Sequence, residues 1–485
     1  MTRRVFCHTL GCDKNLVDSE ALLGRFAHRG VVAVDDPDRA DIWVLNTCGF
    51  IDAARADSDE ALRAFVAAKA MRTLVVCGCW TQEHGDEIRR RYPEIDVVAG
   101  VGEFDRVVAA CLGTPEAPDA PAAAGPLVGP PDEAVYAGLA DRPLLTPPHV
   151  AFVKLGEGCN CHCTFCRIPL IRGRLRSRPS AEIVAEVRGL VQRGVGEIQL
   201  VSQNTSDYGR DTGETLLDLV TALDRVTGLR RIRLLYLYAG LVSTDTLLRL
   251  LDLPTVVPYL DLPIQHASPR LLRAMRRPGG ETASPRFFGA LRAARPDLVL
   301  RTTALLGFPG EDDDDVARLA DFLAEVEFDH LGTYRYSPEQ GTPAASLPDP
   351  VPAEVSLDRE ALIMDLQAEI SLARQIGRLD RRWEVVVDSL HDAGDDDTRG
   401  LLDSLAEGSW PDAQERSYLQ RVCRRGGRVA LGRSVHYGYD IDGVVVLPGE
   451  GLSVGQWLPA DFRAATAYDT WAVPRRGADS EKGHA

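Results

Sequence analysis

The chain has 485 residues, of which 45% are hydrophobic and 26% charged, as expected for a folded protein of two to four domains. No apolar run reaches the ~18 residues that a membrane helix needs, and the start Met1-Thr-Arg-Arg does not resemble a signal peptide, so we expect a cytoplasmic protein without membrane contact. The formal charge of −16 disfavours nucleic-acid binding, because phosphate binders carry basic surfaces, and it fits a basic partner or solubility alone.

Residues 1–112 alternate strand and helix patterns, which predicts an N-terminal open α/β domain with a mainly parallel sheet. An amphipathic helix is predicted at Leu16–His28. Buried strands are predicted at Arg4–Leu10, Ile42–Asn46 and Leu74–Val76. Residues 113–148 are rich in Pro, Ala and Gly, a composition that cannot build a core, and they are predicted to be a linker.

Residues 149–380 form the central domain of this prediction. Six strand patterns with helical patterns between them predict a partial (β/α)6 barrel. The strands are predicted at Ala151–Leu155, Glu197–Ser202, Arg231–Tyr236, Pro258–Leu262, Val299–Leu305 and His330–Tyr336. Helices are predicted at Ala181–Gln192, at Asp314–Val326 and over 352–380, and the last of these is expected to pack against the side of the barrel.

Residues 381–472 change to short strands separated by turn residues, which predicts a small C-terminal β-barrel. The strands are predicted at 383–390, 428–435, 443–448 and 456–466. An acidic stretch from about Asp392 to Gln414 is predicted to be an irregular insertion in this barrel. The polar residues 473–485 are predicted to be a disordered tail.

Three of the eleven cysteines, Cys159, Cys163 and Cys166, follow the first barrel strand with the spacing C-x3-C-x2-C. Three thiolates on one loop can bind three irons of a 4Fe–4S cube and leave the fourth iron open to a reactant. A structural zinc site is the alternative. It needs a fourth ligand, which Cys161 and His162 offer only from inside the same crowded loop.

Cys12, Cys48 and Cys79 each follow a predicted strand of the N-terminal domain. Because the carboxyl ends of parallel strands share one edge of a sheet, these cysteines are expected to converge. They would form a second set of three cluster ligands with one open iron. Three unrelated buried cysteines are the alternative.

These six cysteines and the order of the domains resemble the radical S-adenosylmethionine (SAM) methylthiotransferase family, in which the C-terminal barrel is called a TRAM domain. The resemblance covers residues 2–112 and 149–472 and is strongest to the RimO type. It is carried by seven further motifs, Lys14-Asn-Leu-Val-Asp-Ser-Glu20, Asn46-Thr-Cys-Gly-Phe-Ile-Asp52, Thr146-Pro-Pro-His149, Leu262-Pro-Ile-Gln-His-Ala-Ser268, Gly307-Phe-Pro-Gly-Glu311, Tyr336-Ser-Pro338 and Tyr468-Asp-Thr-Trp471.

The resemblance implies two 4Fe–4S clusters and SAM as cofactors. It also implies transfer of a methylthio group to the β-carbon (C3) of an aspartate in the small-subunit ribosomal protein uS12. The implied partners are uS12 or the small ribosomal subunit, an electron donor of flavodoxin or ferredoxin type, and a sulfur donor. No catalytic side chain beyond the cluster ligands is expected. For SAM, an aromatic residue in the cluster loop and polar groups at strand ends are the candidate contacts, namely Phe165, Gln203, Gln265, Arg301 and Thr303.

Four features depart from the RimO pattern. Asp13 stands where proline is usual, Ala239-Gly240 replaces Tyr-Pro, and the segment Val435–Asp440 does not match the expected Asp-Ala-Pro-Glu stretch. The fourth is the long acidic insertion in the TRAM domain. From Trp383 to Trp471 there are fifteen acidic and eight basic residues, which disfavours tRNA phosphates and favours a basic protein. The alternatives are methylthiolation of a tRNA adenosine or of another protein or peptide, and a non-catalytic iron–sulfur protein.

Overall fold

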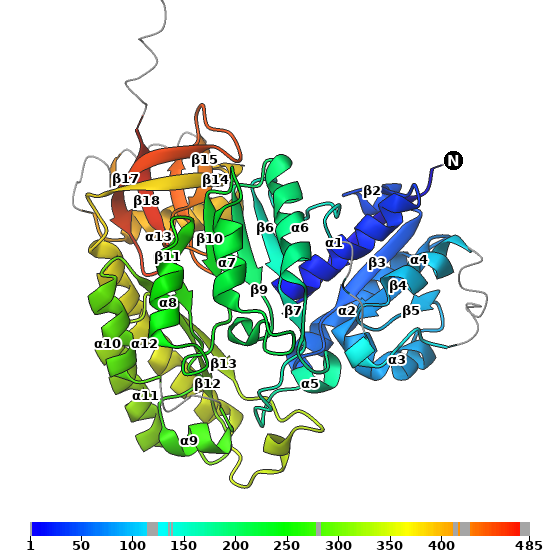
Figure 1. The fold of residues 1–485 in the computed structure, drawn as a ribbon, viewed down its shortest axis with the longest axis horizontal. Coiled ribbons are helices and arrows are strands. Elements are labelled where there is room, and N and C mark those ends of the chain that lie inside the picture. Colours follow the sequence, from blue (N-terminus) through cyan, green and yellow to red (C-terminus); the bar gives the residue numbers. More distant parts are fainter. Residues whose placement is uncertain are drawn as a thin grey trace, which may run out of the picture.

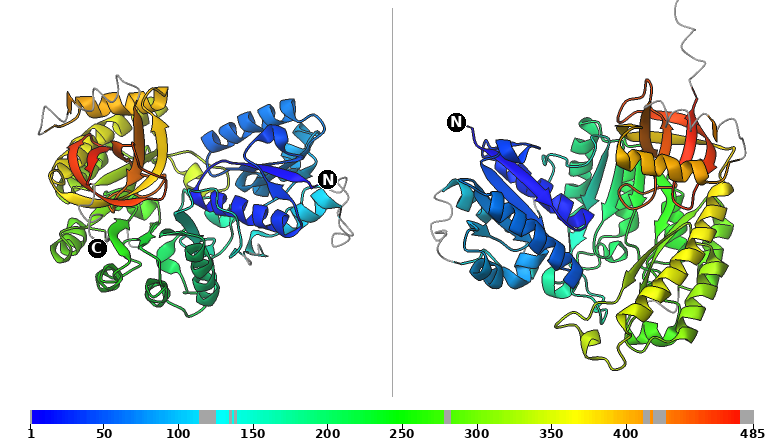
Figure 2. Two further views of the ribbon diagram at one scale, coloured as in Figure 1. Left: turned by 90° about the horizontal axis from the view of Figure 1, so that it is seen from above. Right: turned by 180° about the vertical axis from the view of Figure 1, so that it is seen from behind.

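The computed structural model describes residues 2–113, 125–133, 136, 139–277, 283–410, 416–417 and 427–475. It contains an open five-stranded sheet, an open six-stranded sheet and a closed five-stranded barrel, in that chain order (Figure 1). Seen from above, the N-terminal unit stands to one side of the other two (Figure 2). Within the described residues, no helix has the length and apolar character needed to span a membrane.

The N-terminal sheet has the strand order β2-β1-β3-β4-β5 and is parallel throughout, as predicted. Its strands are β1 Arg4–Thr9, β2 Val32–Ala33, β3 Ile42–Thr47, β4 Thr73–Gly78 and β5 Val97–Val98. Its helices are α1 Asp13–His28, α2 Asp52–Ala68, α3 Cys79–Arg91 and α4 Phe104–Leu112. Because β1, β3 and β4 run in the same direction, the loops that follow them lie at one edge of the sheet.

The central sheet contains the six predicted strands in sequential order, β6-β9-β10-β11-β12-β13, and every pair is parallel. The strands are β6 Val150–Lys154, β9 Glu197–Val201, β10 Arg231–Leu234, β11 Val256–Asp261, β12 Val299–Leu306 and β13 His330–Arg335. A short hairpin, β7 Gly156–Glu157 with β8 Arg176–Ser177, encloses the Cys159–Cys166 loop. The sheet therefore forms a partial (β/α)6 barrel, as the sequence predicts.

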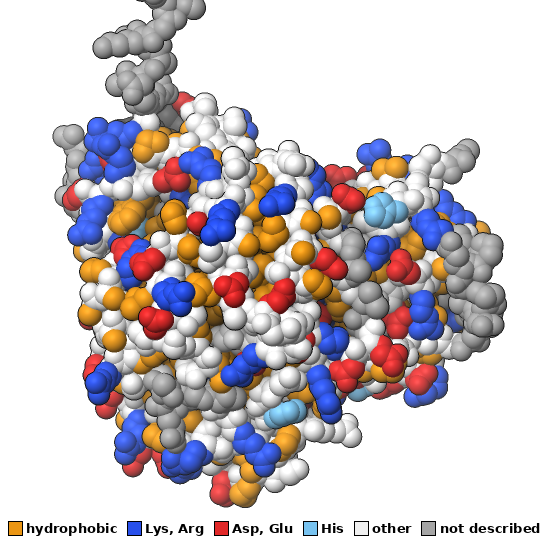
Figure 3. Space-filling model, viewed as in Figure 1, with side chains coloured by type: hydrophobic (Ala, Val, Ile, Leu, Met, Phe, Trp, Pro, Cys, Tyr) orange, Lys and Arg blue, Asp and Glu red, His pale blue; other side chains and the backbone are white. Residues whose placement is uncertain are grey.

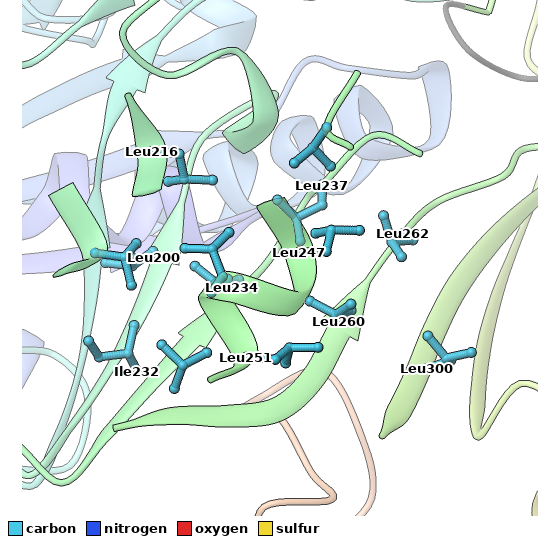
Figure 4. Close-up of a cluster of buried hydrophobic side chains, with 14 of the residues drawn as sticks. Leu200, Leu216, Ile232, Leu234, Leu237, Leu247, Leu251, Leu260, Leu262 and Leu300 are labelled. Atoms are coloured by element: carbon cyan, nitrogen blue, oxygen red, sulfur yellow. The ribbon is translucent and has the colours of Figure 1, made fainter. Parts of the chain in front are cut away.

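Helices cover the outer face of this barrel. They are α6 Ser180–Gln192, α7 Leu216–Asp224, α8 Thr244–Leu251, α10 Pro285–Ala294, α11 Asp313–Val326 and α12 Ala353–Ile376. The short helix α5 Ile168–Ile171 instead packs against α3 of the N-terminal unit, and α9 Pro269–Ala274 follows β11. Strand leucines such as Leu234 and Leu260 pack against Leu247 and Leu251 of α8 in a fully buried cluster (Figure 4). Burial of each such side chain contributes about 1.5–3 kcal/mol, so this core holds the strand ends, and with them the site, in fixed positions.

The C-terminal strands close into a barrel in the order β14-β15-β16-β18-β17, which confirms the small β-barrel. They are β14 Arg382–Asp392, β15 Arg428–Arg433, β16 Val445–Pro448, β17 Trp457–Ala465 and β18 Thr470–Pro474. β18 was not among the predicted strands, because it is short and follows β17 closely. It runs to Pro474, and residues 476–485 of the predicted tail lie outside the described residues.

Two predictions for irregular segments are wrong. The acidic stretch contains the helix α13, Asp396–Glu407, because Leu402 and Leu405 share one face and are buried against Trp471 of the barrel. The Pro/Ala-rich segment does contribute to a core, because Tyr136 and Leu139 are buried in the hydrophobic cluster that joins α1 to the barrel. The parts of these segments at 411–415 and 114–124 lie outside the described residues.

Candidate iron–sulfur and S-adenosylmethionine site

The three N-terminal cysteines lie at the carboxyl edge of their sheet. Cys12 caps α1 after β1, Cys48 follows β3, and Cys79 opens α3 directly after β4. The backbone of the β1 loop approaches Cys48 so closely that a Cβ on Gly11 would lie 2.8 Å from the Cβ of Cys48. Positions 12 and 79 are at helix N-termini, where the helix dipole favours a thiolate.

The electrostatics of these cysteines indicate one shared site. Burial, with smaller contributions from Cys12 and Cys48, raises the pKa of Cys79 to about 12 against the opposing effect of Arg172. Burial also raises the pKa of Cys48, with Cys12 as a contributor. Bound iron would remove these protons, since metal ligation requires thiolates. Three thiols that lie within each other's electrostatic field, with two helix N-termini, are a donor set that fits a cluster with three protein ligands.

The second cysteine set lies in the loop between β7 and α5. The loop is held by backbone hydrogen bonds from Cys159 N to Gly173 O (3.1 Å) and from Cys166 N to Cys163 O (3.1 Å). Burial raises the pKa of Cys166 to about 12, and the charges of Cys163 and Cys159 add to this effect. These three thiols also share one electrostatic environment, which fits a second cluster.

Cys161 points toward polar groups at the end of β9. The Asn204 amide donates to its sulfur (3.3 Å), and its thiol lies 3.8 Å from Asp207. A hydrogen bond with Cys159 raises the pKa of Cys161 and lowers that of Cys159. Among the described residues, no three His, Cys, Asp or Glu side chains are grouped to hold a single metal ion.

The sequence did not predict two residues that contact the second set. Burial raises the pKa of the Cys163 thiol, whereas Arg277 and Tyr238 both lower it, and the Arg277 guanidinium lies 3.6 Å from the centre of the Tyr238 ring. Arg277 is 9% exposed and also donates to Pro263 O (2.6 Å). Neither residue stands in a motif that suggests a cluster, since both come from barrel segments far along the chain.

A buried polar network connects the two cysteine sets. Arg172, the residue directly after α5, donates to the sulfur of Cys79 (3.2 Å), to Asp18 (2.7 Å) and to Glu157 (3.1 Å). Lys154 of β6 is fully buried and pairs with the same two carboxylates. Asp18 lies in the Lys14–Glu20 motif, which the sequence offered as part of the resemblance to the RimO type.

Two further ion-pair groups tie the N-terminal unit to the barrel. Arg142 is fully buried between Glu20 of α1 and Glu186 of α6. Glu339, after β13, accepts from the Asp52 backbone (2.9 Å) and pairs with Arg55 and Arg167. The carboxyl edge of the N-terminal sheet is therefore held against the cluster loop of the barrel.

The five predicted SAM contacts have different surroundings. Phe165 packs beside Met275 and Phe308, and Gln203 donates to Glu157 (3.3 Å) while its carbonyl oxygen is buried without a hydrogen-bond partner. Gln265 takes a positive φ of 69° and pairs its backbone with β12, where Thr303 is 8% exposed. Arg301 is engaged in ion pairs with Asp261 (3.0 Å) and Asp442 (3.3 Å).

The departures from the RimO pattern at Asp13 and in Val435–Asp440 have structural roles. The Asp13 carboxylate pairs with Lys14 (2.8 Å) and accepts from the Tyr236 hydroxyl (3.2 Å), while its second oxygen is buried and unpartnered. The segment Val435–Asp440 follows β15, and the backbone oxygen of its His436 accepts from the ring of His330 on β13 (2.8 Å). Ala239 is a buried member of the barrel core.

Comparison with known proteins gives matches over almost the whole chain. Residues 4–100 match the model of "Uncharacterized protein family UPF0004", and residues 153–323 match the "Radical SAM superfamily". Two curated proteins named "Ribosomal protein uS12 methylthiotransferase RimO" match over 96% of this chain and 98% of their own length. That of Anaeromyxobacter sp. (strain K) is 38% identical, and that of Thermus thermophilus is 36% identical.

A solved structure supports the fold. The radical S-adenosylmethionine methyltransferase TsrM of Kitasatospora setae, with tryptophan and a SAM analogue bound, has a TM-score of 0.52 and 15% identity, covering 81% of this chain and 79% of its own. At this identity only the fold is comparable. The matches to curated relatives cover the N-terminal, barrel and C-terminal units together, and on that evidence the chain belongs to the RimO family of radical SAM methylthiotransferases.

Proposed function

We propose that this enzyme transfers a methylthio group to the β-carbon of an aspartate in ribosomal protein uS12. The observation that carries the proposal is the pair of three-cysteine sets, held on facing units by the buried network around Arg172. The RimO relatives, whose name specifies uS12, match from end to end, so the same substrate is the simplest assignment. A cytoplasmic location follows from a ribosomal substrate.

In this proposal Cys159, Cys163 and Cys166 hold the cluster that binds SAM, and Cys12, Cys48 and Cys79 hold the second cluster. When bound, these groups and SAM supply reductive cleavage of SAM and a methylated sulfur for transfer to carbon. Phe165, Gln203, Gln265, Arg301 and Thr303 remain the candidates for SAM contacts. Gln203 has the strongest support, because its buried carbonyl oxygen has no partner.

The protein's own contribution to the reaction is to orient the groups and to exclude water. Arg142, Arg172 and Glu339 lock the N-terminal sheet edge onto the barrel mouth through buried ion pairs. A reactive carbon radical must be shielded from solvent and from stray hydrogen donors, so a closed chamber between the two units is required. We further propose a flavodoxin- or ferredoxin-type electron donor and a separate sulfur donor, since the chemistry consumes both electrons and sulfur.

The test is anaerobic reconstitution of the full-length protein with iron, sulfide, SAM and dithionite, followed by mass spectrometry of two substrates. Isolated uS12 or 30S subunits should gain one methylthio group on an aspartate. Bulk tRNA from the same cells should stay unmodified. Modified tRNA with unchanged uS12 would instead assign the tRNA adenosine reaction, and cleavage of SAM with no product on either would point to another protein or peptide.

A further inference from the structure

The N-terminal cysteine set is contacted by one buried arginine that comes from outside the set. Arg172 donates to the sulfur of Cys79 at 3.2 Å. Arg172 is 2% exposed, so water screens its charge only weakly.

Arg172 has an additional property, because it belongs to one unit and contacts a ligand of the other. It lies in the barrel segment that follows the Cys159–Cys166 loop, whereas Cys79 opens α3 of the N-terminal unit. It also contacts Asp18 of α1 and Glu157, which precedes the cluster loop by two residues. The N-terminal cysteine set therefore has its arginine contact only when the barrel unit packs against the N-terminal unit.

Hydrogen bonds and positive charge at ligand sulfurs are among the features that set the potential of an iron–sulfur cluster. Reduction adds negative charge, and a nearby cation stabilises the reduced form and raises the potential. Electrostatic attraction is strong where the charges are buried, so a single buried guanidinium at 3.2 Å from a ligand sulfur is sufficient to change the reduction potential of the cluster.

We propose that Arg172 is a positioning residue that raises the reduction potential of the N-terminal cluster from across the unit interface. The inference rests on the proposed function, because it takes Cys12, Cys48 and Cys79 as cluster ligands.

The test uses the full-length protein with both clusters, in redox titrations with dithionite followed by electron paramagnetic resonance. Signals are assigned with the variant in which Cys12, Cys48 and Cys79 are alanine. Arg172→Gln should lower the midpoint potential of the N-terminal cluster and leave that of the other cluster unchanged. Arg172→Lys, which keeps a cation for Asp18 and Glu157, should give a smaller shift in the same direction.

Tyr136→Phe is the matched control, because the Tyr136 hydroxyl accepts from Arg172 at 3.2 Å and its removal leaves the contact between Arg172 and Cys79 in place. It should leave both potentials unchanged. Selective loss of about half the iron from Arg172→Gln would show that Arg172 holds the N-terminal cluster in place and does not set its potential, and it would overturn the proposal. Unchanged potentials with full iron content in Arg172→Gln, or equal shifts of both clusters, would overturn it. A wild-type protein with iron for only one cluster would refute the proposed function itself.

Discussion

At the scale of single residues, Gly307 is a position where the backbone demands glycine. Its φ is +73°, and a Cβ would lie 2.4 Å from the hydroxyl oxygen of Ser356 on α12. We expect Gly307→Ala to destabilise the protein by about 1–3 kcal/mol, through backbone strain and this clash. Gly289→Ala is the matched control, because Gly289 lies in α10 with no atom within 4 Å of the added Cβ, and it should be neutral or slightly stabilising. Equal loss of thermal stability in both variants would contradict this account.

The six cysteines allow a second prediction at this scale. Replacing Cys12, Cys48 and Cys79 with alanine should remove about half of the bound iron, because in the proposed function Cys159, Cys163 and Cys166 hold the other cluster independently. The variant should still cleave SAM to 5′-deoxyadenosine and should form no methylthiolated product. Iron analysis and chromatography of the nucleoside give the two readouts. If the triple variant loses all its iron or retains all of it, the two sites are not independent.

Sequence spacing was sufficient to propose the six cysteines but not their partners. C-x3-C-x2-C is a local pattern, and the other three cysteines each follow a recognisable strand. The buried partners Arg172, Arg277 and Tyr238 come from segments with no local signal, and their contacts exist only once the barrel and the N-terminal sheet pack together. Asp13 is a second example of partners that the sequence did not reveal. It departs from the RimO pattern, and the structure shows that it pairs with Lys14 and accepts from Tyr236.

At the scale of elements, the contact between α1 and α6 depends on one buried arginine. Arg142 lies between Glu20 and Glu186, and all three side chains are at most 1% exposed. Arg142→Met should cost about 3–5 kcal/mol, because it leaves two carboxylates buried without a counter-charge. Arg188→Met, on the exposed face of the same helix α6, should change stability by less than about 0.5 kcal/mol.

The pH dependence of the Arg142→Met variant provides the check on the cause. Burial already raises the pKa of Glu20 against the opposing effect of Arg142, and loss of the arginine should raise it further. When the pKa of a carboxyl group is higher in the folded state than in the unfolded state, the protein loses stability as the pH rises above the unfolded-state pKa. The deficit in melting temperature should therefore be larger at pH 8 than at pH 5. A deficit that does not vary with pH would indicate lost packing instead.

Asp329 gives the opposite pH dependence. Burial alone would raise the pKa of Asp329, but Arg378, Arg374 and Arg292 together hold it below its usual value. A depressed carboxyl pKa contributes stability above the unfolded value of about 3.9, and this contribution is lost as the pH falls through the folded-state value. Asp329→Asn should lower the melting temperature at pH 7. Below pH 4, the melting temperature of this variant should decrease less steeply with falling pH than that of the wild-type protein.

The control for Asp329 is an exposed pair in the same region. Asp297→Asn removes the partner of Arg295 at a position that is 45% exposed, and it should change stability by less than about 1 kcal/mol. A wild-type and an Asp329→Asn protein with parallel stability curves between pH 3 and pH 7 would show that this carboxylate does not contribute in the way described.

The elements that the sequence predicted well are those with strong periodicity. The six barrel strands lie within about two residues of their predicted ends, since buried parallel strands form short apolar runs between helices. The helix α13 was missed because its acidic surface outweighed two apolar positions, Leu402 and Leu405. Those two leucines are buried only because they pack in one cluster with Trp471 of the barrel, a contact that the local sequence does not reveal.

At the scale of the whole molecule, net charge and local charge differ. The chain carries −16, yet acidic and basic side chains are intermixed over the face in Figure 3. In the C-terminal barrel, α13 carries a run of acidic residues, whereas Arg382, Arg463 and Arg475 converge on Asp461 at another place. The net negative charge that favours a protein substrate over tRNA is therefore not spread evenly over this unit. The choice of substrate is best tested by measuring how substrate binding depends on salt.

The net negative charge of the chain predicts that substrate binding depends on salt concentration. A protein with a charge of −16 attracts a basic ribosomal protein over distances comparable to the Debye length, which falls from about 14 Å at 0.05 M salt to about 6 Å at 0.3 M. The KM for isolated uS12 should therefore rise several-fold over this range, while kcat at saturating uS12 stays nearly constant, because the buried ion pairs that hold the site are weakly screened. SAM cleavage without uS12, measured in the same buffers, is the control for salt effects on the clusters. A KM that is independent of salt would show that short-range contacts alone select the substrate, and a KM that falls with salt would show that the enzyme presents a basic surface, such as the arginines around Asp461, to it.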